Sequence, residues 1–428
     1  MLKTLALERY KAFVDRVEVE LKPLTLLFGR NSAGKSSILR AIPLTAASIG
    51  PVKPNRTGPL ALEHDAAMGM AYADLCSRLS TGSDLLISLT WDVEPPALVA
   101  GIEWHLRDIQ DFSRRGQVVD QARLLDADGE ILLETELDLD GDSDLQSGCH
   151  VLKDQPGSVA FEGLQLRSEG GLSKENETHV DDASRALKRI SERVDWLSPL
   201  RDSIPRQTQP SENPAIQSDG WGTTELLSHP SRRALLARTT TWAKELFGHG
   251  VSVSHEAGDV ALVADFDDGR PVNLCGVGSG VGQILPVLAH LALIAEGRAD
   301  GRVIAIEQPE AHLHADAEVT LGRAIVEAVN ARGQANAHGQ AQERPSLVLE
   351  THSETLLLSL QLAVLEKRLA PEDLVAYWVY TDEDRKGRVE KITFDAQARP
   401  TPPWPSGVFS ESTVLARKIL QGRRGMRG

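Results

Sequence analysis

The chain has 428 residues, of which 41% are hydrophobic and 25% are charged, so its composition is that of a globular protein of two or three domains and excludes a disordered or fibrous one. Forty-six Lys and Arg against 61 Asp and Glu give a net charge of −15, which argues against a surface built throughout for nucleic acid and leaves only a local basic patch open. Three cysteines without pairing or metal spacing indicate a reduced, cytoplasmic protein, and no apolar run approaches the ~20 residues of a membrane span.

Residues 24–28 form a short apolar run that predicts a buried strand, and a glycine-rich turn and a helical pattern follow it. Alternating segments near 83–92, 117–125, 130–138 and 158–166 predict antiparallel hairpins, one of which closes at 126–129. An acidic belt from Asp120 to Asp144 runs through these hairpins. It is more typical of solvated strand faces than of a metal site or a mimic of nucleic acid.

The second half of the chain alternates between helical and strand patterns. A stripe from Ala183 to Leu197 predicts a helix capped by Asp181 or Asp182, and residues 223–247 predict a helix interrupted at Pro230. The pattern then predicts strands at 251–255 and 260–266, a helix from about 279, a strand at 302–307, a helix at 316–331, a polar loop at 332–345 and a strand at 346–350. Such alternation indicates a parallel sheet.

The segment from Gly29 to Ser36 fits the pattern GxxxxGKS between a strand and a helix, which is the context of a phosphate-binding loop. The glycines let backbone N–H groups turn toward a triphosphate, and the helix N-terminus adds partial positive charge. Lys35 would reach the β and γ phosphates, and Ser36 would ligate Mg²⁺. The sequence therefore predicts an ATP and Mg²⁺ site here.

Three further segments lie at predicted element ends. Glu307 follows four apolar residues and is the expected metal-holding carboxylate, with Gln308 and Glu310 close behind it. The glycines around Ser279 precede a helix and predict either an anion site or a flexible turn. His352 follows an apolar strand, where it would either contact a γ phosphate or cap the next helix.

These four motifs, in this order, resemble an ABC-type ATPase head of the structural-maintenance-of-chromosomes, RecF and OLD (overcoming lysogenization defect) proteins. The matching segments are 2–39, GVGSGVGQILPVL, VIAIEQPEAHLH and LVLETHSETLLLSL. WLSPLRDSIPR and the segment from Trp404 to Phe409 resemble one bacterial subgroup of AAA-family ATPases. The likeness covers about 1–80 and 195–410. It implies an α/β fold of the P-loop NTPase, ABC-head type with an antiparallel β region and a helical insertion. Only about 75 residues follow His352, too few for the Toprim nuclease domain of OLD proteins.

The resemblance implies a composite site between two copies of the chain. Each ATP would be held by one subunit through Gly29, Arg30, Asn31, Ser32, Ala33, Gly34, Lys35, Ser36 and Ser37. The other subunit would contribute Ser279, Gly280, Gly282 and Gln283. Metal binding would fall to Ser36 and Glu307, and His352 would sense the γ phosphate.

Two departures from the family pattern affect hydrolysis. Gln308 stands where such heads have the catalytic Glu, and an amide cannot accept the proton of the attacking water, so Glu310 is the substitute expected here. No Gln occurs between Ser36 and Ile109, so the glutamine that normally contacts the metal is missing.

The sequence thus predicts an ATPase head that dimerises on ATP and regulates an effector protein or engages DNA, as in bacterial anti-phage defence or DNA repair. A slow or non-hydrolysing ATP-gated scaffold is the alternative. The expected domains are 1–95, with the P-loop; 96–240, a β-hairpin and helical insertion; 241–398, with the remaining motifs; and a tail at 399–428.

Overall fold

A computed structural model of the chain describes residues 1–50, 56, 58–110, 115–138, 149–256, 258–267, 269–299, 301–331, 343–405 and 408. Several sequence predictions lie outside these residues. They are Asp140, Asp142 and Asp144 of the acidic belt, most of the loop at 332–345, Gly407 and Phe409, and the rest of the tail, and the side chain of Ser279 is likewise outside the description.

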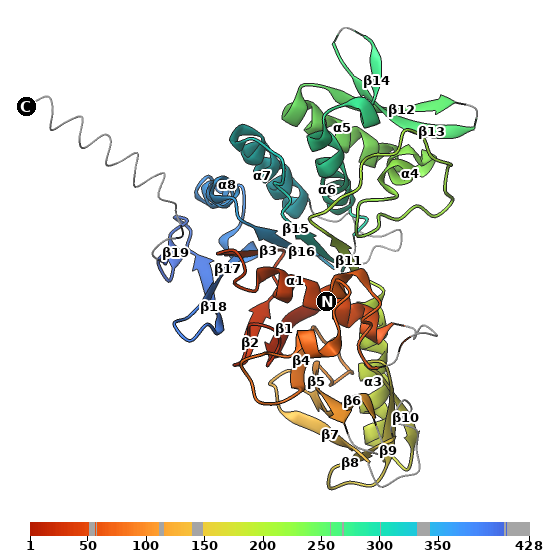
Figure 1. Ribbon diagram of the computed structural model, residues 1–428, viewed down its shortest axis with the longest axis vertical. Helices are drawn as coiled ribbons and strands as arrows, with labels where there is room; N and C mark the ends of the chain where they lie inside the picture. The colour runs from red at the N-terminus through yellow and green to blue at the C-terminus, as the bar shows by residue number, and fades with distance from the viewer. Residues whose placement is uncertain are drawn as a thin grey trace, which may run out of the picture.

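The strand that precedes the P-loop lies inside a mixed sheet. Among the described residues the strand order is β11-β15-β16-β3-β17-β18-β19, and the first five strands are parallel (Figure 1). The bounds are β3 Leu24–Gly29, β11 Val194–Leu197, β15 Val303–Glu307, β16 Ser346–Thr351, β17 Leu374–Thr381, β18 Gly387–Phe394 and β19 Pro400–Thr401. The predicted parallel sheet is therefore confirmed.

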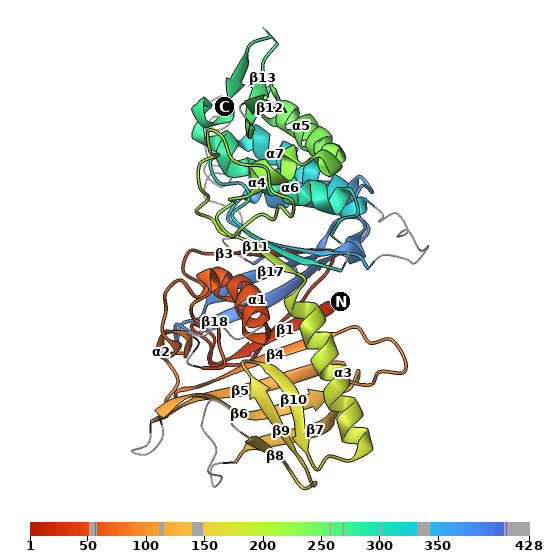
Figure 2. The same ribbon diagram turned by 90° about the vertical axis from the view of Figure 1, so that its right-hand side faces the viewer.

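Helices cover both faces of this sheet because its strands are buried on both sides. Leu27 faces a core shared with helices α1 (Lys35–Ile49) and α3 (Lys174–Ser191), whereas Leu26 and Phe28 face the opposite core. This alternation follows from the two-residue period of a strand. The second core packs against α5 Arg233–Phe247, α6 Ser279–Ala295, α7 Ala315–Asn330 and α8 Glu354–Leu365 (Figure 2).

An antiparallel sheet lies on the α1 side. Within the described residues its order is β10-β9-β8-β7-β6-β5-β4-β1-β2, so the predicted antiparallel segments are present. The strands β1, β2, β5 and β8 were not predicted, and the segment expected at 158–166 forms two strands, β9 and the start of β10. The bounds are β1 Leu2–Glu8, β2 Val17–Glu20, β4 Asp84–Trp91, β5 Gly101–Gln110, β6 Arg115–Leu125, β7 Ile131–Leu137, β8 Cys149–Leu152, β9 Ser158–Glu162 and β10 Gln165–Gly170. The boundary expected at residue 95 falls between β4 and β5, which are hydrogen-bonded neighbours in this sheet.

One predicted helix has different bounds. It begins at Lys174 and is capped by Ser173, whose side chain accepts from the backbone N–H of Asn176, rather than by Asp181 or Asp182. Val194 and Leu197 were expected on the same helix, but they lie in β11, where they pair with β15. The helical spacing was wrong here because pairing with a buried strand overrides local periodicity.

The remaining elements lie around the start of α6. The helix break at Pro230 is confirmed between α4 (Thr223–Ser228) and α5, and the strands predicted near 251 and 260 are β12 (Gly250–Glu256) and β13 (Asp259–Asp265) of a small sheet. β14 Pro271–Asn273, α2 Tyr72–Leu75 and short 3-10 helices at Asp65–Ala67, Pro230–Arg232, Leu274–Gly276 and Pro371–Asp373 complete the described elements. None of the described helices combines the length and apolarity needed to cross a bilayer. The predicted α/β P-loop fold with an antiparallel β region and added helices is confirmed.

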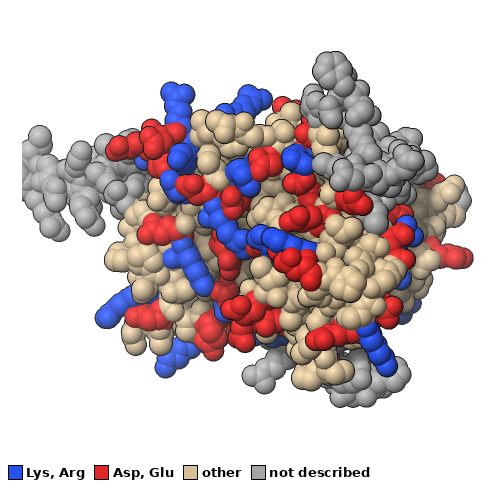
Figure 3. Space-filling model, turned by 90° about the horizontal axis from the view of Figure 1, so that it is seen from below, with Lys and Arg blue, Asp and Glu red and all other residues tan. Residues whose placement is uncertain are grey.

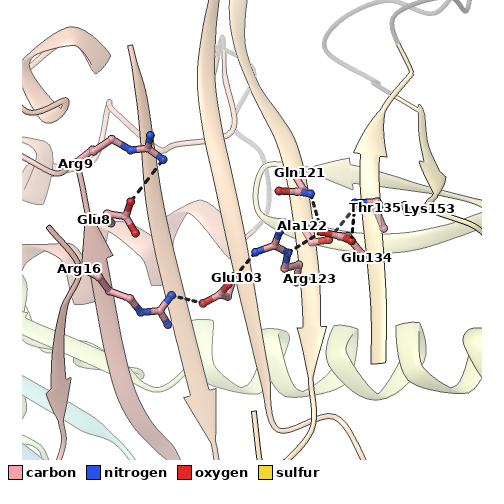
Figure 4. A network of polar contacts seen from close by, with 10 residues as sticks. All are labelled: Glu8, Arg9, Arg16, Glu103, Gln121, Ala122, Arg123, Glu134, Thr135 and Lys153. Atoms are coloured by element: carbon pink, nitrogen blue, oxygen red, sulfur yellow. Dashed lines mark hydrogen bonds and ion pairs between the residues drawn. The ribbon is translucent and has the colours of Figure 1, made fainter. Parts of the chain in front are cut away.

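The described acidic side chains of the β region are largely paired across strands. Glu103 accepts from Arg16 at 2.5 Å, and Glu134 accepts from Arg123 at 2.7 Å and lies 3.3 Å from Lys153 (Figure 4). Basic and acidic side chains also alternate over the face seen from below (Figure 3). Within the belt itself, Asp120 pairs with Arg107 at 2.6 Å and Glu136 lies 3.8 Å from Lys153. No group of three or more His, Cys, Asp or Glu among the described residues is placed to hold a metal ion, and the interpretation of the belt as a solvated face stays a prediction.

Candidate nucleotide-binding site

The P-loop joins β3 to α1 in a conformation that only glycine permits at two points. A Cβ on Gly29 would lie 2.0 Å from the carbonyl oxygen of Val379, and Gly34 has a φ of 108° with the Phe13 ring 2.7 Å from a Cβ placed there. Gly34 is the N-cap of α1, so Lys35, Ser36 and Ser37 occupy the first helical turn. The backbone N–H groups of that turn have no partners within the helix, which makes this end of α1 suited to an anion.

Lys35 is buried beneath the loop that it belongs to. Its Nζ donates to the carbonyl oxygens of Gly29 at 3.0 Å and Arg30 at 2.8 Å, and only 3% of the residue is exposed. Burial lowers the pKa of Lys35, an effect that the carboxylates of Glu350 and Glu310 oppose. The ammonium group is therefore held by weak neutral acceptors, which a phosphate oxygen can replace.

The other P-loop side chains divide by exposure. Arg30, Asn31 and Ser32 are exposed, Ser32 has a φ of 61°, and Ala33 is buried. Ser36 and Ser37 are half-buried at the start of α1, and Ser36 Oγ donates to Glu350 Oε1 at 2.8 Å. The structure therefore places Ser36 beside a carboxylate on β16, the strand between β3 and β15.

Glu307 ends β15 and is held by two side chains that sequence reasoning did not assign to the site. Arg40, four residues after Ser36 on α1, donates to Glu307 Oε1 at 2.7 Å and to Oε2 at 2.6 Å. Trp196 Nε1 donates to Oε1 at 2.9 Å. Both oxygens of the expected metal-holding carboxylate thus accept hydrogen bonds from the protein, and only 1% of the residue is exposed.

The segment after β15 turns sharply. Gln308 has a φ of 45° and its backbone N–H donates to the Glu350 carbonyl oxygen at 2.8 Å. Arg201 Nη2 donates to the Glu307 carbonyl oxygen at 2.5 Å. Non-glycine residues in this left-handed region are uncommon and cluster at functional sites.

Glu310 lies next to the residue expected to sense the γ phosphate. Its Oε1 accepts from the backbone N–H of His352 at 2.9 Å, while Oε2 is buried and has no partner among the described residues. Burial raises the pKa of Glu310. Burial and the nearby Lys35 charge lower the pKa of His352, which favours its neutral ring. Ser353, and not His352, caps α8, because its side chain accepts from Leu356 N.

The segment at the start of α6 lies against the loop that follows β15. Gly278 is the N-cap, and a Cβ on Gly280 would lie 3.5 Å from the His312 carbonyl oxygen, so this turn borders the loop after β15. A Cβ on Gly282 would lie 3.7 Å from Ile204 N. Gln283 Nε2 donates to the Arg201 carbonyl oxygen at 2.6 Å, so this side chain is engaged within its own subunit.

Four contributors to the site were missed by sequence reasoning: Arg40, Trp196, Arg201 and Glu350. For Arg40 and Glu350 the sequence contained a signal. Arg40 is four residues from Ser36 and so shares its helix face, and Glu350 follows three apolar residues as Glu307 follows four. Trp196 and Arg201 come from a separate segment, and nothing in their local pattern indicated contact with Glu307.

Two family models match the chain. One, described as "AAA domain, putative AbiEii toxin, Type IV TA system", matches residues 153–359, and a second AAA-domain model matches residues 1–46. Between them these matches cover the P-loop, the start of α6, Glu307 and His352. No curated protein matches the sequence.

Solved structures of SMC heads are similar to the chain. An SMC head bound to the C-terminal winged-helix domain of ScpA has 12% identity and a TM-score of 0.47, covering 92% of this chain and 98% of that one. The SMC head domain from Thermotoga maritima has 12% identity and a TM-score of 0.40, with 91% and 98% covered. A Pyrococcus furiosus SMC head with an extended coiled coil, bound to the C-terminal domain of ScpA, has 10% identity and a TM-score of 0.45, with 99% of each chain covered.

AAA-domain proteins are generally ATPases, and P-loop ATPases typically bind ATP with Mg²⁺. The β3, P-loop and α1 geometry and the matches to AAA-domain models agree, and together they support an ATP-binding P-loop ATPase head.

Proposed function

We propose that the protein binds and hydrolyses ATP in a site shared by two copies of the chain, with Mg²⁺ as the metal. The observation that supports this is that Ser36 donates to Glu350 at the end of β16, while Lys35 lies near the carboxylates of Glu350 and Glu310. Lys35 would neutralise the phosphates, Ser36 would ligate the metal, and the bound metal would offset charge on the phosphates.

Glu310 is the proposed general base. Gln308 cannot take a proton, whereas Glu310 is buried beside the His352 backbone with one free carboxylate oxygen among the described atoms. The raised pKa of Glu310 suits a base that must also release its proton. His352, in its neutral form, would donate one N–H to the γ phosphate.

The second copy would supply the start of α6. Ser279, Gly280 and Gly282 begin that helix, whose first N–H groups are free to meet a phosphate, and none of the described hydrogen bonds joins them to Lys35 or Ser36. Gln283, being bonded to Arg201, would support this turn and leave the phosphate contact to its neighbours. Closure of two heads on ATP would then change the surface offered to an effector protein.

The proposal also includes DNA binding and a role in anti-phage defence or repair, for which the structure offers less support than for ATP binding. A local basic patch for DNA would draw on Arg201, Arg206, Arg232, Arg233 and Arg238. Of these, Arg201 is buried and Arg238 pairs with Glu296 and Glu327. Internal contacts therefore leave fewer of these arginines available to bind DNA.

The test is steady-state ATP hydrolysis at several protein concentrations, with and without duplex DNA, for the wild type and Glu310→Gln. Turnover per subunit should rise with concentration and fall in the variant by about 100-fold, the usual contribution of a general base. The amide of the variant can still accept from His352 N. Glu318→Gln is the matched control, because Glu318 accepts from the adjacent Ser353 and should leave turnover unchanged.

ATP-dependent dimers without turnover would favour the alternative, an ATP-gated scaffold that holds an effector, which Gln308 supports. Failure of the wild type to bind ATP at all would contradict both proposals.

A further inference from the structure

Two glutamates lie side by side at the edge of the sheet next to the P-loop. Glu307 of β15 and Glu350 of β16 are direct partners in the parallel register, and Glu350 is in turn opposite Leu27 of β3. They are 1% and 3% exposed. Burying two carboxylates together is costly unless each has a compensating charge or hydrogen bonds.

The protein compensates only one of them fully. Glu307 has the bidentate Arg40 and the Trp196 N–H. Glu350 receives a single hydrogen bond, from Ser36, and its Oε2 is buried without a hydrogen-bond partner among the described residues. None of the ion pairs found in the described part of the chain involves Glu350, since Lys35 Nζ is directed to loop carbonyls.

The position of Glu350 matches the needs of a small cation. Mg²⁺ binds oxygen at about 2.0–2.1 Å in an octahedron, so adjacent ligands lie about 2.9 Å apart. Ser36 Oγ and Glu350 Oε1 are 2.8 Å apart. One or two carboxylates with phosphate oxygens are the usual set for this metal, and the orphaned Oε2 supplies a further acceptor for a metal-bound water.

We propose that Glu350, and not Glu307, is the carboxylate that holds Mg²⁺ together with Ser36. This inference rests on the proposed function, in which ATP lies on the P-loop. Glu307 acts as a positioning residue, which fixes Arg40 and the end of β15 so that Glu350 keeps one oxygen without a hydrogen-bond partner among the described residues.

The test measures metal binding and not turnover. ATP affinity is determined by calorimetry in EDTA, and Mn²⁺ affinity of the ATP complex by electron paramagnetic resonance with Mg²⁺ competition. The chains compared are the wild type, Glu350→Gln, Glu307→Gln and the control Glu354→Gln, in which a half-buried glutamate of α8 is neutralised. The amide oxygen that Glu350→Gln introduces can still accept from Ser36, so the variant should fold. Glu350→Asp keeps the charge on a side chain one methylene shorter, and so measures how far Mn²⁺ affinity depends on the position of the carboxylate.

We expect ATP affinity in EDTA to stay within about 2-fold for Glu350→Gln, while Mn²⁺ affinity falls about 10- to 100-fold, the range seen when a metal-site partner is lost. Glu350→Asp should fall between the wild type and Glu350→Gln. Glu354→Gln should keep Mn²⁺ affinity within about 3-fold of the wild type. Glu307→Gln weakens the hold on Arg40 and should lower Mn²⁺ affinity, but by less than Glu350→Gln does.

Unchanged Mn²⁺ affinity in Glu350→Gln would overturn the inference, and a loss confined to Glu307→Gln would assign the metal to Glu307 instead. If the wild type binds ATP in EDTA, either of these variant results contradicts the assignment of the metal to Glu350 but leaves the proposed function unaffected. A wild type that binds no ATP overturns the proposed function, and this inference with it.

Discussion

Two carboxylates of this protein have opposite surroundings: Glu134 in the antiparallel β region, and Glu350 at the carboxyl end of β16 beside the P-loop. Glu134 is close to solvent and is met by both Arg123 and Lys153, and its pKa is lowered by the Arg123 hydrogen bond. Glu350 is buried beside another acid, and burial followed by Glu307 raises its pKa to about 7. The paired, partly exposed Glu134 lowers the free energy of unfolding little if at all, and its role is structural. The buried Glu350 lowers the free energy of unfolding, which indicates a functional role.

The sharpest contrast is between two lysines that each lie near carboxylates. Lys35→Ala should weaken ATP binding by at least about 30-fold, because it removes the buried cation that would neutralise the phosphates. Lys153→Ala, which removes an exposed partner of Glu134, should leave ATP affinity unchanged. Calorimetric titration with ATP distinguishes them, and equal affinities for the wild type and Lys35→Ala would refute the P-loop assignment.

The next contrast is between two arginine–glutamate pairs. Arg40→Ala leaves the 1% exposed Glu307 with only the Trp196 N–H, so the free energy of unfolding should fall by about 3 kcal/mol. Arg123→Ala breaks a pair whose members are partly exposed and should cost less than about 1 kcal/mol.

Urea unfolding at pH 7 measures both costs. The double variant Arg40→Met with Glu307→Met should recover much of the loss, because no buried charge remains unpaired. A loss from Arg40→Ala no larger than that from Arg123→Ala would mean that Glu307 is not effectively buried.

The smallest effect is a difference in pH dependence between Glu350 and Glu134. The folded protein holds the Glu350 proton more tightly than the unfolded chain, so stability is lost as pH rises from about 4.5 to about 7. Glu350→Gln avoids this cost and should be about 1 to 3 kcal/mol more stable than the wild type above pH 7, a gain that disappears near pH 4.5.

Glu134 should behave in the opposite way. Its pKa is lowered, so its contribution is present above pH 4.5 and is lost as pH falls through the folded pKa, and Glu134→Gln should be slightly less stable than the wild type at pH 7. Thermal unfolding in EDTA between about pH 3 and pH 8 checks both signs. A Glu350→Gln variant that is destabilised at pH 8 would show that its charge is already compensated.

Comparison of predicted and observed elements shows where local patterns suffice. The P-loop, the hairpin that closes at 126–129, the Pro230 break and the strands β15 and β16 were predictable because each depends on neighbouring residues: glycines in a turn, alternation or an apolar run in a strand, or a proline in a helix. β17 was not predicted. The end of α3 was not predictable, because Val194 and Leu197 satisfy a helical stripe and a strand equally well. Only pairing of β11 with β15 decides between them.

The sequence by itself determined that this protein has a phosphate-binding loop between a strand and a helix, and that acids and a histidine follow later apolar strands. Which acid keeps an oxygen without a hydrogen-bond partner depends on the folded arrangement. Glu307 and Glu350 both end apolar runs, but Arg40 and Trp196 reach Glu307 while Ser36 alone reaches Glu350. The physical reason is that compensation of a buried charge depends on side chains brought together from distant segments, and no local pattern records that meeting.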